Sequence, residues 1–74
     1  MTIHEVIEVL QAKNIYYTLS SHRDMVIMAT AAVPGERWEI EVFPNGSVEM
    51  EIFKSDGEMY DAKNFLEKIT EFVD

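Results

Sequence analysis

Two runs of alternating apolar and acidic residues lie on either side of a short turn sequence, Pro44-Asn45-Gly46. Alternation with a period of two is typical of a strand that buries one face. The turn sequence predicts a type I turn centred on Pro44 and Asn45, with Gly46 following in the left-handed conformation. A shorter Asn-Gly loop would mix the apolar and acidic faces, so the pattern excludes it. The expected pairs are Trp38 with Ile52, Ile40 with Met50, Val42 with Val48, Glu39 with Glu51 and Glu41 with Glu49.

This hairpin gathers glutamates on one face of the sheet, where they oppose each other directly. Like charges in that position destabilise a sheet by some tenths of a kcal/mol per pair, so folding alone does not explain them. The face is either simply solvated or it binds a partner. Apolar residues share the face, and they either cover one another at the sheet edge or anchor that partner. The candidate partner-binding residues are Glu39, Glu41, Glu49, Glu51, Phe43, Phe53 and Met28.

Helices are expected at both ends of the chain. Thr2 and Glu5 form a capping box ahead of an amphipathic helix, which Asn14 can end in the left-handed conformation. Asp61 is expected to cap a second helix. The apolar stripe of that helix comprises Ala62, Phe65, Leu66, Ile69, Phe72 and Val73.

Between the helices, strands are expected over residues 15–20 and 25–33, ahead of the hairpin. A type II turn at Pro34-Gly35 pairs the second of these with the third strand, placing Ala31 opposite Trp38. The expected fold is therefore α+β: a four-stranded antiparallel meander with the N- and C-terminal helices packed on one face, in the order α-β-β-β-β-α. Residues 1–74 form a single domain. Trp38, Phe65 and Phe72 are expected in its core.

The composition restricts the possible partners. The chain has 14 acidic and 6 basic residues, a formal net charge of -8. This charge repels nucleic acids and anionic membranes and attracts basic proteins. Absence of cysteine, of a long apolar run and of a basic leader at the N-terminus favours a cytoplasmic location.

Catalysis is not expected. Ser20, Ser21, His22 and Asp24 include the residue types of a hydrolase triad, but they are nearly consecutive, whereas triad members converge around a buried carboxylate. An open sheet face lacks the cleft of a glycosidase. It also presents carboxylates in flatter geometry than a calcium site requires. We therefore expect no catalytic residue, no cofactor and no metal ligand.

The segment Val33-Pro34-Gly35-Glu36-Arg37-Trp38-Glu39-Ile40-Glu41-Val42-Phe43, with Asn45-Gly46 and residues 53–58, resembles a group of short uncharacterised bacterial proteins. This resemblance covers roughly the middle half of the chain and implies no activity. In size and charge, the chain more loosely resembles immunity proteins and antitoxins that bind basic nuclease toxins.

Two functions remain open at this point. The first is a noncatalytic acidic protein-binding module, such as an immunity or inhibitor protein, that docks its glutamates on a basic partner. The alternative is a homo-oligomeric structural protein. Because burying the glutamates against themselves is costly, a homodimer should use the edge of the strand at residues 15–20.

Overall fold

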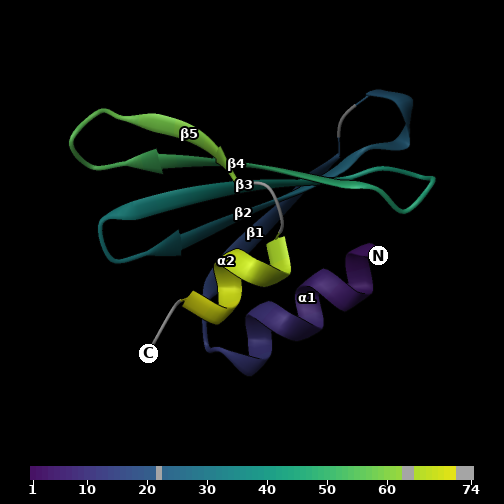
Figure 1. Ribbon diagram of the computed structural model, residues 1–74. Helices are drawn as coiled ribbons and strands as arrows, with labels where there is room; N and C mark the ends of the chain where they lie inside the picture. Colours follow the sequence, from purple (N-terminus) through teal and green to yellow (C-terminus); the bar gives the residue numbers. More distant parts are fainter. Residues whose placement is uncertain (22, 63–64, 72–74) are drawn as a thin grey trace.

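The computed structural model describes residues 1–21, 23–62 and 65–71. For residues 60–62, 70 and 71 only the backbone is described. Two helices cover one side of an antiparallel sheet, and no described helix lies on the other side, which we call the open side (Figure 1). The strands lie side by side in the order in which they occur along the chain. The elements are α1 (Ile3–Ala12), β1 (Tyr16–Ser21), the 3-10 turn η1 (Arg23–Met25), β2 (Ile27–Val33), β3 (Glu36–Val42), β4 (Val48–Lys54), β5 (Met59–Ala62) and α2 (Phe65–Glu71).

The predicted capping box starts α1. The amide of Glu5 donates to the Thr2 hydroxyl at 3.2 Å, and the amide of Thr2 donates to Glu5 Oε1 at 2.7 Å. These bonds satisfy amides that the first helical turn leaves without a partner, and they hold the pKa of Glu5 below its ordinary value. Asn14 ends the helical segment with φ of 56°, as expected.

Both predicted turns and both predicted registers are confirmed. The amide of Gly46 donates to the Phe43 carbonyl at 2.9 Å, and Gly46 has φ of 90°. Gly35 has φ of 78°, as a type II turn requires. The register then places Trp38 between Ala31 and Ile52. Because the turn geometries set these registers, local residues decide which side chains are buried.

The sheet contains a fifth strand that the sequence analysis missed. After β4, the Lys54 amide donates to the Glu58 carbonyl at 2.8 Å, and the Glu58 amide donates to Asp56 Oδ1 at 3.0 Å. The chain therefore turns back and pairs β5 with β4. The expectation that Asp61 caps the second helix is wrong, because Asp61 lies in β5 and α2 begins at Phe65.

The core lies between the sheet and the helices. Its largest fully buried side chains are Trp38, Leu10, Ile40, Ile52 and Val6. Phe65 is also buried, as predicted, whereas Leu66 points away from the core and is 47% exposed. Phe72 and Val73 fall outside the described residues. The buried face is thus the predicted one, with small residues of β2 making room for the indole.

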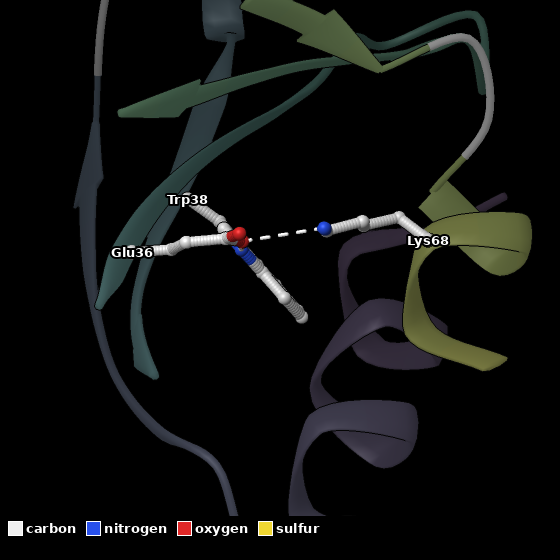
Figure 2. A network of polar contacts seen from close by, with 3 residues as sticks. All are labelled: Glu36, Trp38 and Lys68. Atoms are coloured by element: carbon white, nitrogen blue, oxygen red, sulfur yellow. Dashed lines mark hydrogen bonds and ion pairs between the residues drawn. The ribbon is translucent and has the colours of Figure 1, made fainter. Parts of the chain in front are cut away.

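An ion pair links the second helix to the sheet at the margin of this core (Figure 2). Glu36 begins β3 on the helix side, where its Oε1 accepts a bond from Trp38 Nε1 at 2.8 Å. Lys68 Nζ lies 3.2 Å from the same oxygen and 5.8 Å from the centre of the indole ring. Burial favours the neutral form of Glu36, but the indole N–H and the Lys68 ammonium together outweigh it and lower its pKa. One carboxylate therefore orients the core tryptophan and holds α2 against the sheet.

Candidate protein-binding face

The glutamates occupy two adjacent rows on the open side of the sheet. Glu39 of β3 faces Glu51 of β4, and Glu41 faces Glu49 in the next row. Glu49 is exposed and the others are half-buried. Alternation along each strand keeps these side chains on the face opposite Trp38. We call this surface the acidic face.

A cation that the sequence analysis overlooked lies at one end of the acidic face. Arg37 Nη2 is 3.5 Å from Glu39 Oε2, and the guanidinium lies over the Phe53 ring, 4.6 Å from its centre. Arg37 precedes Glu39 by two residues in β3, so the alternation of the sequence also predicts that Arg37 lies on the acidic face. Its side chain is 56% exposed, which makes the ion pair a weak one.

The remaining glutamates have no such cation. Among residues 1–21, 23–62 and 65–71, no basic side chain forms an ion pair with Glu41, Glu49 or Glu51. Glu51 has Asp61 as its backbone partner in β5. Within the part of the chain that the structure describes, the neighbouring strands therefore supply no cation to this part of the acidic face.

The apolar candidates do not form one cluster. Phe53 pairs with Arg37 at one end of β3, whereas Phe43 follows the last residue of β3 at the other end. The interval of six residues corresponds to about 20 Å along a strand. Met28 lies opposite Glu41, within the sheet. The register therefore separates Phe43 from Phe53, so these two rings do not cover one another and flank the glutamate rows from opposite ends.

Two shallow hollows adjoin these aromatic residues. One, of about 370 Å³, is lined by Arg37, Phe53 and Lys54 together with the β2–β3 turn. The other, of about 200 Å³, lies beside Phe43 and is lined mainly by apolar residues. The lining residues of the second are Met1, Thr2, Ile3, Met25, Ile27, Val42, Phe43, Pro44 and Gly46. The first hollow adjoins the acidic face at Arg37 and Phe53, whereas the second, lined by residues at the start of α1 and by Ile27 and Val42, opens on the helix side of the sheet.

The residues weighed for catalysis are spread over β1 and η1. Ser20 and Ser21 end β1 and are exposed, Asp24 is exposed in η1, and His22 is outside the described residues. Among the described residues, no three His, Asp or Glu side chains gather in a way that would hold a metal ion. No described helix is long and apolar enough to cross a membrane.

Comparisons with protein-family models, curated proteins and solved structures found no match to this chain.

Proposed function

We propose that this protein is a noncatalytic binding module of the cytoplasm whose acidic face docks on a basic protein. The observation that carries the proposal is the pair of opposed glutamates, Glu41 and Glu49, together with Glu51, which have no cationic partner in the described part of the chain. A sheet that served stability alone would gain by placing opposite charges there. Arginine and lysine side chains of a partner would complement the face instead.

The surroundings of the glutamates support a protein ligand rather than loose counterions. Met28 and Phe53 offer half-buried apolar surface beside the carboxylates, and Phe43 adds a half-buried aromatic ring at the far end. Binding energy at protein interfaces comes largely from such desolvated anchors, while surrounding charges raise the rate of association. The acidic face has both components.

A basic nuclease is the class of partner that we consider first. Such an enzyme has a groove shaped for phosphates, and rows of carboxylates held on a rigid sheet can occupy that groove in their place. The net charge of -8 would speed the encounter at low ionic strength. On this proposal the protein acts as an immunity or antitoxin protein that blocks the groove.

The test begins by identifying the partner with an affinity pull-down and mass spectrometry. Surface plasmon resonance then compares the parent protein with a variant carrying Glu39→Lys, Glu41→Lys, Glu49→Lys and Glu51→Lys. The variant should fold and lose binding, because charge repulsion at an interface costs several kcal/mol. High salt should slow association of the parent, since the Debye length falls to about 3 Å at 1 M. Unchanged affinity of the variant would show that the binding site lies on another surface.

A further inference from the structure

The first strand lies at an edge of the sheet and lacks two features that usually protect such an edge, charged residues and proline. Residues Tyr16–Ser21 of β1 pair with β2 on one side, and no strand of the described residues pairs with β1 on its other side. The strand contains no charged residue and no proline, in a chain of net charge -8. Natural proteins normally place charges, prolines or bulges on such an edge, because its open backbone groups can pair with another chain.

Apolar surface lies along this edge on the helix side of the sheet. Leu19 belongs to the same face as the core residues Ala29 and Ile40, yet it is 47% exposed. Gln11 Nε2 donates to the Tyr17 hydroxyl at 2.9 Å, which shows that this side of α1 faces β1. Ile7 precedes Gln11 by one helical turn, so it lies on the same side of α1, where it is half-buried.

Ile7 and Leu19 lie in the same direction from the contact of Gln11 with Tyr17. The chain reverses between α1 and β1, so moving back from Gln11 to Ile7 corresponds to moving forward from Tyr17. One helical turn advances about 5.4 Å and two strand residues about 6.6 Å. Ile7, Tyr17 and Leu19 carry no charge, and we call these three residues the edge strip.

We propose that the edge strip binds a second copy of this chain, with β1 of each copy pairing antiparallel to β1 of the other. The distribution of charge favours a second copy at this edge over other parts of the surface. Two molecules of net charge -8 repel each other over most of their surfaces, but the facing strands at this seam contain no charge. The opposite edge differs, because β5 contains Asp61, follows Glu58 and has only 4 residues.

The sequence of β1 also selects a register. A two-fold axis perpendicular to the sheet places the helix side of one copy next to the helix side of the other. Residues that face each other across the seam must therefore lie on the same side of the sheet. An axis between the two copies of Thr18 meets this condition and places Tyr17 of each copy opposite Leu19 of the other. Tyr16 then faces Ser20, so the pairing spans residues 16–20. Aromatic–aliphatic and Thr–Thr pairs stabilise antiparallel strands when directly opposed.

This dimer would be one continuous sheet with both acidic faces on the same side. The inference does not depend on the proposed function, since the acidic face remains uncovered. If both hold, the dimer offers two linked binding surfaces, which raises the avidity for a partner with two basic sites.

Sedimentation equilibrium on the purified chain, over micromolar to millimolar concentrations, tests the proposal. The parent should reach twice the 8.6 kDa of one chain. Thr18→Lys places two like charges at the axis on an exposed site, so it should weaken the dimer roughly tenfold or more while the circular dichroism spectrum is retained. Met59→Lys makes the same charge change on the other edge, where Met59 is 57% exposed, and should leave the dimer intact. A monomeric parent, or equal effects of the two variants, would overturn the proposal.

Cross-linking tests the register separately. The chain has no cysteine, so Thr18→Cys introduces a single thiol. Mild oxidation or a short bis-maleimide should join two Thr18→Cys chains, because facing Cβ atoms lie about 4.5 to 5.5 Å apart. Met59→Cys is the matched control and should not be joined. Failure of Thr18→Cys to cross-link in a dimeric sample would exclude pairing through β1 in this register.

Discussion

Trp38 Nε1 donates a hydrogen bond to Glu36 Oε1 over 2.8 Å, two residues back along the same strand. Both side chains lie on the helix side of β3, where Lys68 of α2 approaches the same carboxylate at 3.2 Å. The carboxylate accepts this bond from an indole N–H at the margin of the core. One ionised side chain therefore adds to the buried Phe65 and Ile69 in attaching α2 to the sheet.

Glu36→Gln should therefore lower the free energy of unfolding by about 1 kcal/mol at pH 7, since it removes a charge-assisted hydrogen bond and the ion pair. The pKa of Glu36 is below its ordinary value of 4.5 in the folded protein. Its contribution is thus fully present above pH 4.5, the value in the unfolded chain, and is lost as pH falls through the lower folded pKa. Urea unfolding of both proteins at several pH values measures this difference, which should shrink on acidification. A constant difference would contradict the role of the ionised carboxylate.

Trp38→Ala should cost about 3 to 5 kcal/mol, because it empties the largest buried site in the core. Small domains often have total stabilities near 5 kcal/mol, so the variant should retain at most about 2 kcal/mol and melt at a much lower temperature than the parent. Thermal denaturation followed by circular dichroism measures the effect. Trp38→Phe keeps much of the volume and should lose less. A melting temperature within a few degrees of the parent would show that the indole contributes little to the core.

Gly46→Ala should destabilise the protein more than Gly57→Ala. Both glycines have positive φ, 90° and 93°, so alanine is strained by about 1 to 2 kcal/mol at either site. A Cβ at Gly46 would also lie 3.3 Å from the backbone nitrogen of Met1, whereas nothing lies within 4 Å of one at Gly57. Comparing the two by urea unfolding isolates the contact of the hairpin turn with Met1. Equal losses would indicate that this contact relaxes without cost.

Glu41→Gln combined with Glu49→Gln should leave the isolated domain equally stable or more stable by some tenths of a kcal/mol, because it relieves an opposed like-charge pair. Urea unfolding at low ionic strength maximises the effect. A large loss of stability in the double variant would mean that these carboxylates serve the fold, and it would weaken the proposed function.

The sequence predicted those parts of the fold that local residues determine. The turns at Pro34-Gly35 and at Pro44-Asn45-Gly46 set the registers of β2, β3 and β4, so the positions of Trp38 and of the four glutamates followed. The strand β5 was missed because Met59–Ala62 is short and lacks an alternating pattern. Its pairing depends on the edge that β4 leaves open, which is a tertiary effect.

The candidate site was predicted less completely than the fold. The glutamate rows were found by alternation, but Arg37, with the same alternation, was not assigned to that face. The register also predicts the separation of Phe43 from Phe53. Seeing it requires comparing their positions along the strands, and the sequence analysis compared only the faces on which they lie. Glu36 and Lys68 were also missed, because their contact joins β3 to α2 across the core margin.

The most direct test of the acidic face as a docking surface compares two charge-matched double variants in binding to the identified partner. Glu41→Lys with Glu49→Lys reverses the glutamates that lack a cationic neighbour. Glu8→Lys with Glu58→Lys makes the same change in net charge at exposed sites on α1 and in the β4–β5 loop. By surface plasmon resonance, we expect the first variant to lose binding, while the second associates somewhat more slowly and dissociates at the rate of the parent. Equal effects of the two variants on affinity would contradict the account, since they would show that the partner senses net charge rather than the acidic face.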